Sequence, residues 1–164
     1  GSSIEKAVLE GKNVEARSKM LIGSMLAGKA FANSPVAAVH ALAYPIGGIY
    51  HIPHGLSNAL VLPYALRFNA VNKKASDDYA AIASFVFPQI NLDQGSQSIC
   101  DDFINHLQQL SSKLGLPQRL RDVNIPQNAC KKMAQEAMKQ TRLLVNNPRQ
   151  ITEEDAINIY KSAW

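Results

Sequence analysis

Cysteine is scarce in this chain of 164 residues, and long hydrophobic runs are absent from it. The two cysteines, Cys100 and Cys130, lie far apart and form no Cys-x-x-Cys pair, so we expect reduced thiols and no disulfide framework. No apolar stretch approaches the ~20 residues that a membrane span needs, and no signal peptide is visible. These features favour a cytoplasmic protein with no membrane partner.

The sequence also lacks the glycine-rich motifs of nucleotide-binding folds. No G-x-G-x-x-G follows a strand-like segment, and neither a G-x-x-x-x-G-K-[ST] loop nor a G-x-S-x-G elbow occurs. No segment alternates apolar and polar residues over five positions with β-branched enrichment. A dinucleotide-binding fold within these residues is therefore not expected, and an all-α fold is favoured.

Charge is present but thinly spread. Charged residues make up 18% of the chain, the net charge is +4, and 46% of the residues are apolar. The densest basic group, Lys131, Lys132, Lys139 and Arg142, has helical spacing and includes Glu136, which is typical of a solvated helix face. We expect no nucleic-acid partner, and the low charge fraction suggests that some surface meets another domain or subunit.

Capping and periodicity signals predict six to eight helices in a single domain spanning residues 1–164. Pro45 and Gly47-Gly48 are expected to end one helix and open a loop through Pro53, and Pro63 is expected to kink or interrupt the next. The expected helices are 4–10, 13–31 with Asn13 as N-cap, one from Ser34-Pro35 to about Pro45, 54–68, 76–87, 96–114, 127–145 and 152–163. Thr152, with Asp155 three residues later, is a near-match to a capping box for the last of these helices.

Three of the four histidines fall between positions 40 and 54, which makes this the most informative segment. Imidazole is a common ligand of transition metals, and a helix–loop–helix could bring His40 and His54 into one cleft. A catalytic metal usually takes three or more protein ligands, and no carboxylate lies nearby in the sequence. Either these are unrelated helix-end histidines, or the remaining ligands lie outside the chain. His106 lies on an amphipathic helix, and we expect it to have a structural role.

The segment around these histidines resembles the signature region of the iron-containing (group III) alcohol dehydrogenases. The resemblance rests on residues 39–48, VHALAYPIGG, and residues 50–69, YHIPHGLSNALVLPYALRFN. It continues into the preceding helix (15–28), into the Gly-Leu-Pro segment at 115–117 and into the ending YKSAW at 160–164. The likeness therefore spans nearly the whole chain and implies the helical C-terminal domain of the dehydroquinate synthase-like fold.

In this family an N-terminal α/β domain binds NAD(P), and the helical domain binds a divalent metal, usually Fe2+ and sometimes Zn2+, through one aspartate and three histidines. By motif position His40 matches the second histidine ligand and His54 the third. The aspartate and first histidine normally lie upstream in an Asp-x-x-x-His helix. The resemblance therefore implies that the nucleotide domain and half of the metal ligands are absent from this chain.

The resemblance also bears on catalysis. His51 lies in the cleft segment, where it is a candidate contact for substrate or cofactor, and Tyr44 stands where some members have another histidine. The implied activity is NAD(P)-linked oxidation of an alcohol to an aldehyde or ketone by hydride transfer, with the chain inactive alone. Two alternatives stay open: a stand-alone helical interaction module that has lost catalysis, and a related glycerol dehydrogenase or maleylacetate reductase domain. Without its partner domain, the cleft wall is expected to be exposed, which predicts either a homodimer through that face or marginal solubility.

Overall fold

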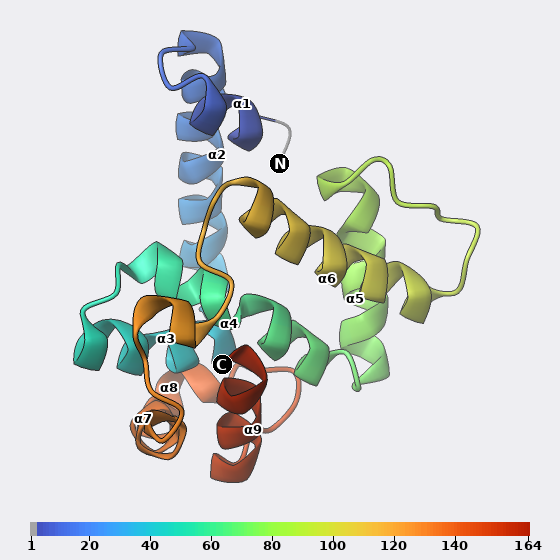
Figure 1. The fold of residues 1–164 in the computed structure, drawn as a ribbon. Coiled ribbons are helices and arrows are strands. Elements are labelled where there is room, and N and C mark those ends of the chain that lie inside the picture. The colour runs from blue at the N-terminus through green and yellow to red at the C-terminus, as the bar shows by residue number, and fades with distance from the viewer. Residues whose placement is uncertain (1–2) are drawn as a thin grey trace.

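The computed structural model describes residues 3–164, and every regular element in that range is helical. Seven of the α-helices are ten residues or longer. This confirms the all-α prediction (Figure 1). The elements in chain order are α1 (Ile4–Leu9), α2 (Val14–Asn33), α3 (Ala38–Tyr50), α4 (His54–Asn69), α5 (Lys73–Val86), α6 (Ser96–Lys113), the 3-10 turn η1 (Leu120–Val123), α7 (Ala129–Met138), α8 (Thr141–Leu144) and α9 (Glu153–Ala163).

Side-chain caps explain where several helices begin. The side chain of Asn13 accepts a hydrogen bond from the Ala16 N–H at 2.9 Å, so α2 starts where the sequence predicted. Thr152 and Asp155 form a reciprocal capping box at the start of α9, also as predicted. α5 begins three residues earlier than expected because Asn72 caps its first turn.

The expected break at Pro45 and Gly47-Gly48 is wrong, because α3 is continuous from Ala38 to Tyr50. It also begins after the Ser34-Pro35 signal rather than at it. Pro45 is buried in the interior of the helix, and burial of this segment outweighs the hydrogen bond that proline cannot donate. Tertiary packing therefore overrides the local preference of these residues.

Two further boundaries differ from expectation. α4 continues through Pro63 to Asn69 without interruption. The single helix expected over 127–145 is instead two, α7 and α8, separated where Gln140 adopts a non-helical ψ of 50°. The Gln140 carbonyl oxygen then accepts from the N–H groups of Leu143 and Leu144, which starts the short α8.

Two hydrophobic clusters form the interior. The first joins α3, α4, α7 and α9 around fully buried Leu42, Ile46, Met133 and Tyr160. The second joins α5 and α6 and includes Phe103. α4 packs against α3, α9 and α6, so it connects the two clusters and holds the histidine segment against the body of the protein.

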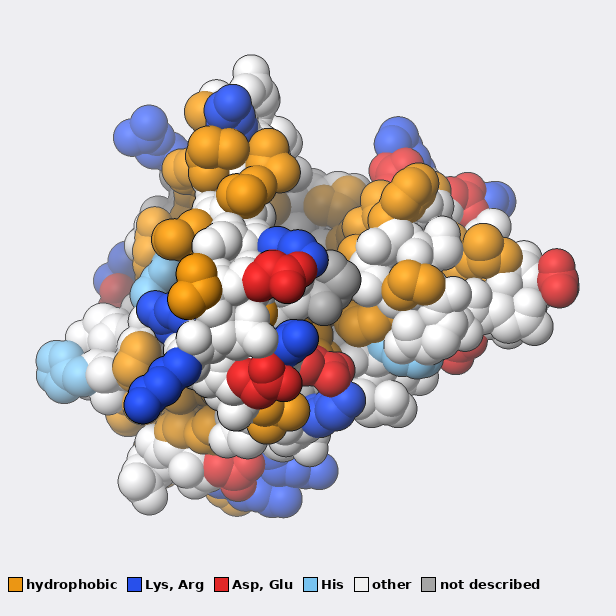
Figure 2. Space-filling view, turned by 90° about the horizontal axis from the view of Figure 1, so that it is seen from above, with side chains coloured by type: hydrophobic (Ala, Val, Ile, Leu, Met, Phe, Trp, Pro, Cys, Tyr) orange, Lys and Arg blue, Asp and Glu red, His pale blue; other side chains and the backbone are white. Residues whose placement is uncertain are grey.

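The α1–α2 pair projects from this body (Figure 1). Ala16 is the one buried residue of α2, whereas Leu21 is 73% exposed and other large apolar side chains of the helix are also exposed. Figure 2 views the molecule from this end and shows hydrophobic side chains at the surface. Part of the apolar surface of this chain is therefore exposed on α2. Among residues 3–164, no helix combines the length and hydropathy required to cross a membrane.

Candidate metal centre

His40 and His54 lie side by side, although their helices are joined by the short segment 51–53 and not by the loop from Pro45 that the sequence predicted. His40 is the third residue of α3 and His54 is the first residue of α4. Their ring centroids are 5.3 Å apart and the ring planes are inclined by 50°. Because the two side chains come from different helices, their proximity depends on the packing of α3 against α4.

The connection between these helices is tightly held. The Ser57 hydroxyl is fully buried and lies 3.1 Å from the carbonyl oxygens of both Ile52 and Pro53. A Cβ added at Gly47 would come within 3.3 Å of the Ile52 oxygen, so glycine permits a close approach of the loop to α3. The loop that precedes His54 is thus held by the Ser57 hydroxyl and by its close contact with α3 at Gly47.

The environment of His40 favours the neutral imidazole. Desolvation lowers the pKa of His40 below its ordinary value, and the neighbouring His54 lowers it further. A metal binds imidazole through a lone pair that protonation would remove, so a neutral ring is the form that suits a ligand. The electrostatics and the geometry of the pair therefore agree.

The separation of the two rings is close to that of two imidazoles bound to one metal ion. Two imidazoles bound at ~2.1 Å to one tetrahedral metal have ring centroids roughly 5 Å apart, close to the observed 5.3 Å. Neutral imidazole suits both iron and zinc. Within residues 3–164, however, no group of three or more histidine, cysteine, aspartate or glutamate side chains is placed to hold a metal. The two imidazoles are therefore fewer than the three protein ligands that a catalytic metal usually takes.

The other two histidines have different surroundings. His51 is exposed and caps the C-terminal end of α3 in the left-handed conformation, with φ 57° and ψ 26°, and its N–H donates to the Gly47 oxygen at 3.0 Å. His106 lies on α6, with its ring 5.3 Å from that of Phe87 and its Nδ1 hydrogen-bonded to the Asp102 carbonyl oxygen. His106 therefore has a structural environment, and His51 occupies a turn near the pair in sequence.

Asn58 is a site residue that the sequence reasoning did not single out. Its side-chain Nδ2 lies 3.0 Å from Nε2 of His54, one helical turn earlier on α4. The spacing of four residues on a helix was the available signal, since such side chains are neighbours.

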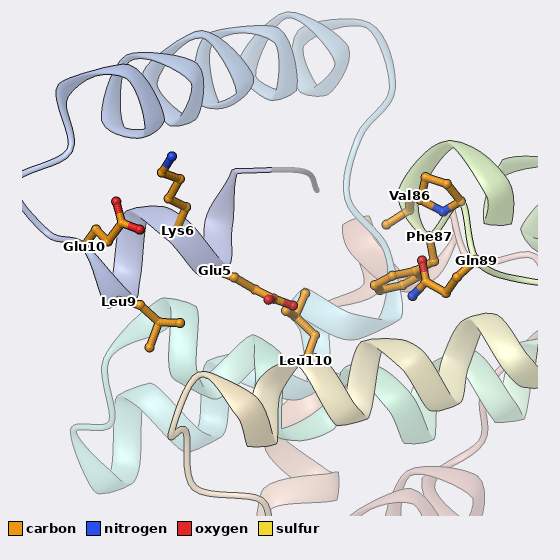
Figure 3. A pocket seen from close by; sticks show the side chains of 9 residues that line it. Glu5, Lys6, Leu9, Glu10, Val86, Phe87, Gln89 and Leu110 are labelled. Carbon is orange, nitrogen blue, oxygen red and sulfur yellow. The ribbon is translucent and has the colours of Figure 1, made fainter.

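One hollow adjoins α3, and a second lies away from the histidine pair. Tyr44, one turn after His40 on α3, lines a hollow of about 310 Å³ with Lys132 and Glu136 of α7. A second hollow, of about 520 Å³, lies between α1 and the α5–α6 pair, and Figure 3 shows side chains from both sides facing it. No histidine lines this second hollow, so it is separate from the candidate metal centre.

Comparison with known proteins identifies the family. The family model for the C-terminal part of the Fe-containing alcohol dehydrogenases matches residues 1–164. This chain belongs to that family. Long-chain-alcohol dehydrogenase 1 of Geobacillus thermodenitrificans is 35% identical over 170 residues, covering 99% of this chain and 40% of that protein. The 1,3-propanediol dehydrogenase of Citrobacter freundii is 33% identical, covering 99% of this chain and 41% of that protein.

Solved structures of iron-type alcohol dehydrogenases have the same fold. A 1,3-propanediol oxidoreductase superposes with a TM-score of 0.92 at 33% identity, over 99% of this chain and 42% of that one. The alcohol dehydrogenase from Oenococcus oeni superposes with a TM-score of 0.91 at 34% identity, over the same shares. The chain thus corresponds to the helical C-terminal domain of these enzymes and spans about 40% of the length of its curated relatives.

Proposed function

We propose that this chain is the metal- and substrate-binding domain of an NAD(P)-linked alcohol dehydrogenase, with residues 1–164 acting as one helical domain. His40 and His54 would be two ligands of its divalent metal, Fe2+ in the first place and Zn2+ as the alternative. The observation that carries the proposal is the convergence of these two imidazoles, 5.3 Å apart, in a member of a metal-dependent family.

The remaining parts would come from polypeptide outside these 164 residues. Two further ligands, an aspartate and a histidine, would complete the metal shell, and an α/β domain would bind NAD(P). The exposed apolar side chains of α2 are suited to contact such a region. The chain alone is accordingly expected to bind metal weakly and to turn over no alcohol.

When bound, the metal would supply Lewis-acid polarisation of the alcohol oxygen. His40 and His54 would hold it as neutral nitrogen donors. The buried Ser57 and the close approach at Gly47 would keep α3 and α4 in their relative positions. His51 is exposed at the end of α3, where it would contact the substrate or cofactor from the rim of the cleft. The chain's contribution is therefore ligand geometry and part of the cleft wall.

The test is an anaerobic titration of the purified chain with Fe2+ and with Zn2+. One metal ion per chain is expected, and the double variant His40→Ala, His54→Ala should lose binding. His106→Ala is the matched control, because it removes an imidazole from the chain without touching the pair. Equal binding by the wild type and the double variant would refute the assignment of the metal to these two residues.

The exposed face of α2 favours a second candidate function, an interaction module that has kept the fold without the chemistry. Sedimentation velocity over a range of concentrations tests it. Self-association together with no metal binding would favour the interaction module. A monomer that binds one metal through His40 and His54 would favour the dehydrogenase domain.

A further inference from the structure

The side chain of Asn58 connects one histidine of the pair to its own helix. Its Nδ2 lies 3.0 Å from Nε2 of His54 and donates to the His54 backbone oxygen at 3.1 Å. Its Oδ1 is buried and has no hydrogen-bond partner within the described part of the chain. All the hydrogen bonds of this amide are thus directed at His54.

The position of the backbone oxygen determines how the amide is oriented. A carbonyl oxygen accepts and never donates, so the Asn58 atom facing it must be the NH2 group. A flipped amide would place two oxygens 3.1 Å apart. The NH2 group has two hydrogens, one for the carbonyl oxygen and one for Nε2. Nε2 of His54 must therefore accept, and the neutral ring carries its proton on Nδ1.

Other asparagines in the chain show what is particular to Asn58. The side chains of Asn33 and Asn146 also donate to the carbonyl oxygen four residues earlier, at 2.8 and 3.0 Å, at exposed positions. Neither has an imidazole as a second acceptor among the contacts of the described residues. The additional bond to the ring and the buried, unpaired Oδ1 belong to Asn58. A buried oxygen without a partner is costly.

We propose that Asn58 is a positioning residue that occupies the Nε2 lone pair of His54 in the metal-free chain and releases it when metal binds. The proposal rests on the assignment of His54 as a ligand. A metal at Nε2 needs the same lone pair. A metal at Nδ1 requires the ring proton to move to Nε2. A protonated Nε2 can no longer accept the hydrogen bond from the Asn58 amide. In both cases the Asn58 amide loses its hydrogen bond to the His54 ring and keeps its hydrogen bond to the His54 backbone oxygen.

Nitrogen NMR of the metal-free, 15N-labelled chain tests the ring arrangement directly. At a pH of about 8.5, where an ordinary imidazole is neutral, the wild type should show His54 protonated at Nδ1 and bare at Nε2. Asn58→Leu should lose this preference, and Asn58→Asp should move the proton to Nε2, because a carboxylate accepts. Asn33→Leu is the matched control and should leave the His54 signals unchanged. A His54 protonated at Nε2 in the wild type, or an unchanged preference in Asn58→Leu, would overturn the proposal.

Zinc affinity tests the competition. Asn58→Leu should bind Zn2+ about fivefold more tightly than the wild type, the equivalent of one ordinary hydrogen bond released. Equal or weaker binding would show that the amide does not compete with the metal. The two proposals fail separately: loss of the His40–His54 metal assignment appears in the alanine variants, whereas failure of the Asn58 proposal appears in the metal-free NMR spectra.

Discussion

Replacing Tyr160 by phenylalanine removes one oxygen atom from the interior of the protein. Tyr160 is fully buried in α9, and its hydroxyl donates to the Leu42 carbonyl oxygen of α3 at 2.6 Å. This bond links residues 118 positions apart and secures the helix that carries His40. The phenylalanine ring keeps the packing, so the change isolates the hydrogen bond.

The expected loss of stability follows from the removal of this single hydrogen bond. Losing a buried neutral hydrogen bond costs about 1–1.5 kcal/mol, and more where the acceptor is left without a partner. We expect the free energy of unfolding to fall by roughly 1.5 kcal/mol, which for a domain of this size lowers Tm by roughly 3–6 °C. Burial raises the pKa of Tyr160. The bond therefore contributes fully below the unfolded pKa of about 10, and its contribution is lost as pH rises through the higher folded pKa.

Thermal and urea unfolding monitored by circular dichroism measure the effect. The difference between wild type and Tyr160→Phe should be constant from about pH 5 to 9 and shrink above about pH 10. Tyr50→Phe is the control, because the Tyr50 side chain is half-buried and its hydroxyl makes no hydrogen bond within residues 3–164. Equal Tm values for wild type and Tyr160→Phe at neutral pH would refute the role assigned to this bond.

Three further predictions concern backbone and capping positions. Gly48→Ala should raise the free energy of unfolding by about 0.5–1 kcal/mol, as alanine does in an open helix position. Gly47→Ala should gain less, because its Cβ would meet a backbone oxygen at 3.3 Å. Thermal unfolding of the two variants side by side checks this difference. Gly115→Ala should cost roughly 1–2 kcal/mol, because φ is +76° there; an unchanged urea midpoint would contradict it. Hydrogen bonding, first from the backbone N–H of Thr152, lowers the pKa of Asp155. Asp155→Ala should therefore cost about 1 kcal/mol at pH 7, and the difference from wild type should fade as the pH drops below about 4, which denaturation at several pH values would show.

Local chemistry is enough to explain much of the secondary structure. Asn13 and the Thr152–Asp155 pair satisfy N–H groups of their own first turns, so their helices begin where the sequence predicted. The absence of alternating apolar and polar residues excluded a sheet on the same local grounds. The motif around His40 and His54 likewise indicated the family, because it depends on residue identity and spacing alone.

The course of α3 depended on contacts from elsewhere in the chain. Pro45 and Gly47-Gly48 favour a break when considered alone, yet α3 is continuous, with Pro45 buried and the Leu42 carbonyl oxygen bonded to Tyr160 of α9. The sequence carries both kinds of signal, and only the tertiary structure shows which one prevails.

The sequence by itself determined the helical class, the family and the two imidazoles that could bind metal. Only the tertiary structure decided that these rings lie 5.3 Å apart and that the Asn58 amide faces His54. The physical reason is range: caps and periodicity act within one or two turns, whereas the approach of two rings depends on how α3 packs against α4 and on the cores beneath them.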